Sequence, residues 1–131
     1  MIKLFFLFLF TITSSYALQI TQDTEFQDIY ENSQNNDKLV LMLYSAKTCP
    51  QCAYMKHKVF TTKEVKQFMD KHFVILEKDI NQDDLPEELE YFGIPTMFFI
   101  DKKGNQVAKI IGSSRAKPFL EKIEKIIKEN R

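Results

Sequence analysis

Hydrophobic residues fall in four short runs with the length of β-strands. The first run, Leu39–Tyr44, is apolar at every position, as expected of a central strand with helices on both faces. The last two runs flank the polar segment Asp101–Asn105, which predicts a β-hairpin in which Gly104 takes a positive φ. The four predicted strands are Leu39–Tyr44, Phe73–Glu77, Met97–Ile100 and Gln106–Ile111.

Between these runs, apolar residues recur three and four positions apart, which is the spacing of amphipathic helices. One helix is predicted from Pro50 to about Phe60, because proline fits the first turn of a helix. Thr61 and Glu64 have the spacing of a capping box that would open the next helix. Further helical faces carry Phe26, Ile29 and Tyr30 after Thr24; Val65, Phe68 and Met69; Asp84 through Phe92 as a short helix; and Phe119, Leu120, Ile123, Ile126 and Ile127.

The order of these elements predicts an α/β fold. Alternating strands and helices require parallel strands, and the terminal hairpin adds an antiparallel edge. We therefore expect a central mixed β-sheet, with a parallel core and an antiparallel terminal hairpin, flanked by helices. The sequence shows no internal repeat and no second domain.

The first 17 residues have the pattern of a signal peptide. Lys3 precedes the apolar residues Leu4–Phe10 and Ile12, and small residues stand at Ser15 and Ala17. An apolar stretch of about ten residues is too short to span a bilayer, which needs about 20. We expect cleavage after Ala17, no stable membrane insertion afterwards, and a domain of residues 18–131 in the periplasm or outside the cell.

Composition narrows the classes of partner. The chain has 18 basic and 18 acidic residues, and this balance gives no support for binding nucleic acid. Its 44% apolar content is enough for a real hydrophobic core. No extended apolar helix face is left over, so we expect a monomer.

The only two cysteines, Cys49 and Cys52, stand where the first strand passes into a helix. Two thiols at this spacing can close into a disulfide and reopen. Cys49 is favoured as a thiolate, because the free N–H groups and positive end of the helix lower its pKa. Between them, Pro50 contributes no N–H, whereas Gln51 is neutral and carries amide donors. Exported compartments are oxidising, so we expect a disulfide unless a partner reduces it.

Together with Ile94-Pro95-Thr96 before a strand, the Cys49-Pro-Gln-Cys52 motif resembles the thioredoxin superfamily over residues 22–129. The resemblance is greatest to exported thioredoxin-like proteins and to the C-terminal domain of the transmembrane thiol:disulfide interchange protein. It implies a thioredoxin-like fold and a cis peptide bond between Ile94 and Pro95. It also implies that the backbone around Ile94, Pro95 and Thr96 binds a partner peptide as an added strand.

The resemblance implies a role for each cysteine. Cys49 would attack a partner disulfide as the nucleophile, and Cys52 would resolve the mixed disulfide. No cofactor is needed beyond the redox-active disulfide. The implied partners are thiols and disulfides of envelope proteins, with an upstream membrane electron donor or oxidant. Basic side chains that could lower the pKa of Cys49, or form a solvated helix face instead, are Lys47, Lys56, His57 and Lys58.

Several positions depart from the family pattern. Thr48 precedes the first cysteine where tryptophan is common, and Leu43 stands where many reducing members carry a buried aspartate. Lys56 replaces a glutamate of the interchange-protein domain. Proton transfer around the second thiol must therefore differ. Glu77, at the end of the neighbouring strand, is the candidate proton acceptor, against the alternative of an ordinary strand-end charge.

Other uses of the cysteines are weaker hypotheses. Zinc would need Cys49, Cys52, His57 and His72 together, and His72 is predicted to lie far from the pair. Covalent haem attachment requires a histidine after the second cysteine, where Ala53 stands. A non-enzymatic binding or chaperone-like module with an inert disulfide is another alternative, although a four-residue ring constrains little of the unfolded chain.

The direction of electron flow is left open by the residues. Ile94 and the absence of a histidine between the cysteines favour a reductant or a general interchange protein. Pro50 favours, more weakly, an oxidant that donates its disulfide to exported proteins. The leading hypothesis is thus an exported thiol:disulfide oxidoreductase that reduces or exchanges disulfides.

Overall fold

The computed structural model describes residues 24–131, and the predicted signal peptide, residues 1–17, lies outside them. Within the described part, no helix is long and apolar enough to cross a membrane. The elements follow the predicted order except at one short helix. They are α1 (Thr24–Asn35), β1 (Leu39–Ser45), α2 (Pro50–Tyr54, continued by a π-helical turn, Met55–Val59), α3 (Lys63–His72), β2 (Phe73–Asp79), β3 (Thr96–Ile100), β4 (Gln106–Ile111) and α4 (Ala116–Glu129).

The four strands form one mixed sheet in the order β2-β1-β3-β4, which confirms the predicted fold class. β1 pairs in parallel with β2 and antiparallel with β3, and β3 pairs antiparallel with β4. The hairpin therefore does more than add an edge, since its first strand is central. The burial of the two strands agrees with this: all five residues of β3 are buried, whereas in β4 only Ile110 is buried. Gly104 in the hairpin has the expected positive φ, +80°.

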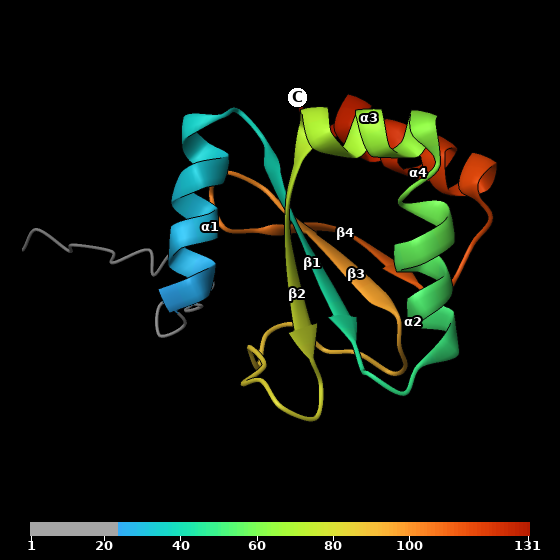
Figure 1. The fold of residues 1–131 in the computed structure, drawn as a ribbon. Helices are drawn as coiled ribbons and strands as arrows, with labels where there is room; N and C mark the ends of the chain where they lie inside the picture. The colour runs from blue at the N-terminus through green and yellow to red at the C-terminus, as the bar shows by residue number, and fades with distance from the viewer. Residues whose placement is uncertain (1–23) are drawn as a thin grey trace, which may run out of the picture.

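Helices cover both faces of the sheet (Figure 1). α1 lies on one face, and α2, α3 and α4 lie on the other. Successive residues of β1 face opposite layers, so Leu41 and Leu43 join the core under α2–α4, and Met42 and Tyr44 join the core under α1. All seven residues of β1 are buried, as its continuous apolar run predicts.

The helix predicted from Pro50 to Phe60 forms over that length, and its second half is a π-helical turn. The capping box predicted from Thr61 is wrong. Thr62 is the N-cap of α3, and its side chain caps no N–H group of that helix. The hydroxyls of Thr61 and Thr62 instead donate to the carbonyls of His57 and Lys58, each at 2.9 Å. Two helices joined with almost no linker leave the carbonyls of the first as the nearest acceptors.

The helix predicted over Asp84–Phe92 is also wrong, because this segment is irregular, with a turn and bends but no helix. Just before this segment, the side chain of Asp83 accepts the N–H of Asp79 at 2.7 Å and stabilises a turn. Leu89 is nevertheless buried in the core under α1, so the segment is anchored by its apolar residues without being helical. Isolated helices of this length are marginal in water.

Candidate active site

The Cys49–Cys52 disulfide closes the first turn of α2. Cys49 is the N-cap residue, with extended backbone angles, and its Sγ accepts the N–H of Cys52 at 3.1 Å. That N–H is one of the donors that a helix start leaves free, so the helix end favours negative charge on this sulfur. Cys49 is partly exposed, whereas Cys52 is fully buried. An incoming partner can therefore reach the first sulfur and not the second.

The proline segment, Ile94–Thr96, lies at the same end of the sheet as the disulfide. The peptide bond between Ile94 and Pro95 is cis, as the family resemblance implies. Thr96 begins β3 and pairs with Tyr44 near the end of β1. Tyr44 comes four residues before Thr48, the residue that precedes Cys49. Because β1 and β3 are neighbours, this register brings the proline segment alongside the loop that carries the disulfide. Pro95 and Thr96 are both buried.

The Gly112–Ser114 segment, which joins β4 to α4, is a third part of the site and was not predicted. It bonds to both of the other parts. The sequence signal for it is weak, because a glycine and two serines between a strand and a helix indicate only a turn. Its contacts are the N–H of Gly112 to the carbonyl of Pro95 (2.8 Å), the hydroxyl of Ser113 to Oε1 of Gln51, and the N–H of Ser114 to Sδ of Met55 (3.3 Å).

Glu77 is held by two donors from neighbouring elements. Its Oε1 accepts hydrogen bonds from Lys56 Nζ at 2.6 Å and from Ser45 Oγ at 2.5 Å. Partial burial raises the pKa of Glu77, but the hydrogen bonds from Lys56 and Ser45 outweigh burial and hold this pKa below its usual range. Glu77 lies opposite Leu43 in the β1–β2 pair, and Lys56 comes one helical turn after Cys52. The carboxylate is thus attached to the helix of the cysteines.

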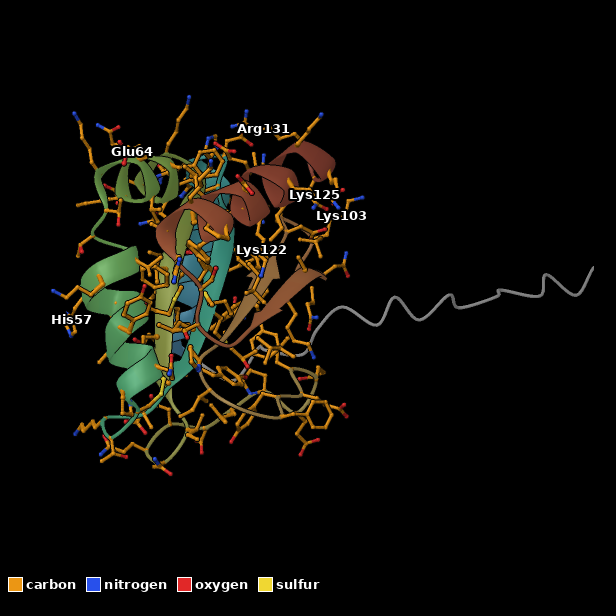
Figure 2. All side chains as sticks on the ribbon, turned by 90° about the vertical axis from the view of Figure 1, so that its right-hand side faces the viewer. His57, Glu64, Lys103, Lys122, Lys125 and Arg131 are labelled. Carbon is orange, nitrogen blue, oxygen red and sulfur yellow. A yellow bond between two sulfur atoms is a disulfide. The ribbon has the colours of Figure 1, made fainter. Side chains whose placement is uncertain are left out.

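The other basic side chains near the motif face solvent. Lys47, His57 and Lys58 are exposed, and Figure 2 shows His57 extending away from α2. Lys56 is bound to Glu77. These positions fit a solvated helix face better than a cluster of charges aimed at Cys49.

The structure does not bring the four potential zinc ligands together. His72 is buried where α3 passes into β2, and Phe73, its neighbour, lies opposite Leu39 at the start of β1. The disulfide follows the other end of β1. Among residues 24–131, no group of three or more histidine, cysteine or carboxylate side chains is placed to hold a metal ion.

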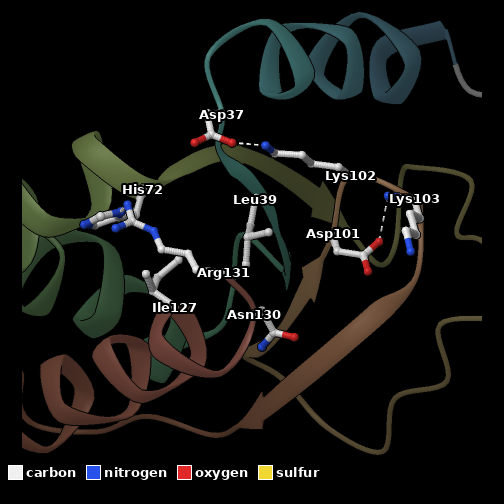
Figure 3. A pocket seen from close by; sticks show the side chains of 9 residues that line it. All are labelled: Asp37, Leu39, His72, Asp101, Lys102, Lys103, Ile127, Asn130 and Arg131. Carbon is white, nitrogen blue, oxygen red and sulfur yellow. Dashed lines mark hydrogen bonds and ion pairs between the residues drawn. The ribbon is translucent and has the colours of Figure 1, made fainter.

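A cavity of about 650 Å³ lies at this far end of the sheet (Figure 3). Much of its charge is already paired. Lys102 binds Asp37, and Oδ1 of Asp101 accepts backbone N–H groups of the hairpin, including that of Lys103 at 2.8 Å. The cavity is separate from the disulfide. Its lining residues are Asp37, Leu39, His72, Asp101, Lys102, Lys103, Ile127, Asn130 and Arg131.

Comparison with known proteins identifies the fold of this site. The model of the thioredoxin-like domain family matches residues 26–127, which is most of the chain. The chain belongs to the thioredoxin-like family. With its disulfide between two residues of a Cys-x-x-Cys motif, this thioredoxin-like protein is an oxidoreductase that exchanges thiols and disulfides.

Its relatives include thiol:disulfide interchange proteins. DsbD of Campylobacter jejuni (strain RM1221) is 24% identical over 116 residues, covering 85% of this chain and 20% of the relative. DsbD of Vibrio vulnificus (strain CMCP6) is 28% identical over 116 residues, covering 83% of this chain and 19% of the relative. The thioredoxin-like protein thus spans about a fifth of the length of these relatives.

Among solved structures, a C-terminal domain of DsbD is similar to this chain. The oxidised C-terminal domain of Neisseria meningitidis DsbD is 26% identical, with a TM-score of 0.60 over 83% of this chain and 97% of that domain. The thioredoxin-like protein is therefore a distant relative of the DsbD C-terminal domain.

Proposed function

We propose that the protein is an exported thiol:disulfide oxidoreductase that reduces or exchanges disulfides of envelope proteins. The observation that carries this proposal is the asymmetric Cys49–Cys52 disulfide, with one accessible sulfur at a helix N-terminus and one buried sulfur behind it. The distant relationship to DsbD supports an envelope location. The signal-peptide pattern of residues 1–17 supports export to the periplasm or beyond.

In the reducing direction, the Cys49 thiolate attacks one sulfur of a partner disulfide. The partner's other sulfur leaves as a thiolate and takes up a proton, and a mixed disulfide remains. Cys52 then loses its proton and attacks Cys49, releasing the partner's second thiol. Two electrons pass from the cysteine pair to the partner, and the Cys49–Cys52 disulfide forms. The same steps in reverse oxidise a partner dithiol.

The partner peptide binds along the proline segment. Thr96 lies inside the sheet, and the carbonyl of Pro95 accepts the N–H of Gly112, so both are already engaged. Among the described residues, none bonds to the backbone of Ile94. In this proposal, the N–H and C=O of Ile94 pair with a partner strand, a mode that makes few demands on partner sequence. Pro95 keeps a backbone N–H away from the sulfurs.

Glu77 acts as the proton acceptor for Cys52 in this proposal. Its lowered pKa keeps it ionised at neutral pH and makes it a weak base, so it would hold the proton of Cys52 only transiently. Lys56 connects it to the helix of the cysteines. Glu77 would thus take the place of the acidic side chain that family members carry at the position of Leu43 or of Lys56.

The reduction potential of the mature protein decides the direction of electron flow. It can be measured by equilibration with glutathione or dithiothreitol, followed by trapping of free thiols. A value of about −250 mV or lower fits a reductant supplied by a membrane electron donor, since thioredoxin lies at about −270 mV. A value of about −120 mV would make the protein an oxidant of exported clients. A disulfide that does not cycle at all would refute the enzymatic proposal.

The roles of the cysteines are tested by two serine variants. Cys49→Ser removes the attacking sulfur and is expected to abolish turnover. Cys52→Ser retains the attack but cannot resolve it, so mixed disulfides with substrate protein should accumulate. Non-reducing gel electrophoresis after acid quenching detects these adducts. Loss of turnover in both variants without a trapped adduct would contradict the assignment.

A further inference from the structure

The Gly112–Ser114 segment bonds to each of the two other parts of the active site. Gly112 holds the proline segment through the carbonyl of Pro95, at 2.8 Å. Gly112 has a φ of +83°, a backbone conformation that would be strained in a residue with a side chain. Ser114 binds the sulfur of Met55, which is buried in the helix that starts at the disulfide. The segment is therefore held in place from both sides.

Between these two anchors, Ser113 contacts the motif itself. Its hydroxyl donates to the side-chain oxygen of Gln51. Gln51 lies in the first turn of α2, directly before Cys52 and one residue from Pro50. A glutamine amide has one oxygen acceptor and one nitrogen with two donors. With the oxygen bound to Ser113, the two N–H donors of the amide are left for another acceptor.

We propose that Ser113 is a positioning residue for Gln51 and, through it, sets the redox equilibrium of the Cys49–Cys52 pair. This inference rests on the proposed function. An oriented amide donor stabilises the thiolate of the reduced protein, as the free N–H groups of the helix do. Loss of the orientation destabilises the reduced form, so the disulfide becomes harder to reduce.

The test is the equilibrium between the protein and glutathione. In it, the reduced pair gives two electrons and two protons to glutathione disulfide, which leaves as two glutathione thiols. Ser113→Ala is expected to raise the equilibrium constant for forming the protein disulfide by about threefold, the size of one neutral hydrogen bond. Alkylation of reduced Cys49 by iodoacetamide at pH 6 should slow in the same variant, because less thiolate is present.

Ser114→Ala is the matched control. It removes a neighbouring hydroxyl, which bonds to the carbonyl of Arg115, and it retains the N–H that binds Met55. This variant should leave both measurements unchanged. Ser113→Thr keeps a hydroxyl and should restore most of the wild-type equilibrium. In Gln51→Leu, the further change Ser113→Ala should have no effect, since the two residues act through each other.

Three outcomes would overturn the inference. They are an unchanged equilibrium in Ser113→Ala, a shift of the same size in Ser114→Ala, or additive shifts in the double variant. Thermal unfolding of each oxidised variant shows whether a shift comes from a general loss of structure. If the wild-type disulfide cycles normally but Ser113→Ala has no effect, the inference on Ser113 fails and the proposed function stands. If the wild-type disulfide does not cycle, both fail.

Discussion

At the scale of single residues, Glu77 places a negative charge between the sheet and the helix of the cysteines. It is held by Lys56 from α2 and by Ser45 from β1, so the charge is fixed in position although the carboxylate is 43% exposed. In the proposed role, this carboxylate would oppose a second negative charge on Cys52 and would receive its proton. The resolving step would then depend on pH.

Replacing Glu77 by glutamine tests this role. Glu77→Gln keeps the shape of the side chain and removes its charge. We expect the release of reduced partner from the mixed disulfide to slow severalfold to tenfold at pH 7, with a weaker rise of the rate between pH 6 and pH 9, because general acid–base groups contribute through proton transfer. Stopped-flow or quenched turnover of a disulfide substrate measures the rate at each pH.

Asp70→Asn is a matched control for the loss of an ion pair. Asp70 pairs with Lys66 at 2.6 Å on the exposed face of α3. Its removal should leave the pH profile of exchange unchanged. A Glu77→Gln enzyme with wild-type rates at every pH would show that Glu77 is an ordinary strand-end charge.

The sequence predicts individual residues well where their chemistry is local. The spacing of Cys49 and Cys52 and the start of a helix between them are visible along the chain, and the disulfide forms there. The cis bond before Pro95 follows from the family resemblance. Ser113 could not be predicted, because its partner Gln51 is 62 residues away and both are common surface residues.

At the scale of elements, the long segment between β2 and β3 is organised by buried side chains. Leu89 is 2% exposed and packs in the core under α1, although its neighbours Glu88 and Glu90 are exposed. This segment leads directly into Ile94 and Pro95.

Leu89→Ala should destabilise the protein. Loss of a buried leucine side chain costs about 2–5 kcal/mol of unfolding free energy, because the transfer of apolar surface is lost and a cavity remains. Urea denaturation of the oxidised protein measures this change.

Leu85→Ala provides the comparison, since Leu85 lies in the same segment but is only partly buried. Its substitution should cost clearly less. Equal small effects of both substitutions would mean that the segment is not anchored by Leu89.

Elements are predictable where a pattern is long and strong. The apolar run of β1 and the amphipathic face of α4 both appear at the expected positions. The helix expected at Asp84–Phe92 does not form, and the segment is anchored instead by the tertiary packing of Leu89. The cap of α3 differs from the prediction because the preceding helix ends directly before α3. Its carbonyl groups accept the hydroxyls of Thr61 and Thr62.

At the scale of the whole molecule, the end of the sheet opposite the disulfide is held by a buried histidine. Nδ1 of His72 lies 2.9 Å from the guanidinium of Arg131, so it accepts a hydrogen bond as neutral imidazole. Burial lowers the pKa of His72, and the charges of Arg131, Lys71 and Lys38 lower it further. In the unfolded chain, its pKa returns to about 6.5.

This difference predicts that the free energy of unfolding decreases as the pH is lowered. Below a pH of about 6.5, His72 binds a proton in the unfolded chain but stays neutral in the folded protein. The free energy of unfolding therefore decreases until His72 is protonated in the folded state as well. Denaturation at pH 8, 6 and 5 should show the loss, and His72→Gln should reduce it. His57→Gln, at an exposed histidine, should retain it. An identical loss in wild type and His72→Gln would refute the prediction.

The arrangement of the whole sheet was only partly predictable. Alternating strands and helices indicated a mixed sheet with a parallel pair, which β1 and β2 form. The central place of β3 depends on which strands bury both faces, and this becomes visible only when the helical layers are in place. The contacts of Gly112–Ser114 depend on that placement.

The order of the strands also divides the enzyme along its chain. Everything before the segment that links β2 to β3 carries the disulfide and Glu77, and everything after it carries the proline segment and the Gly112–Ser114 turn. The two parts meet where β1 pairs with β3. A chain cut within that linking segment would thus separate into one part with the disulfide and without the proposed docking segment, and another part with that segment and without the disulfide. Recovered exchange on mixing them would report their reassembly.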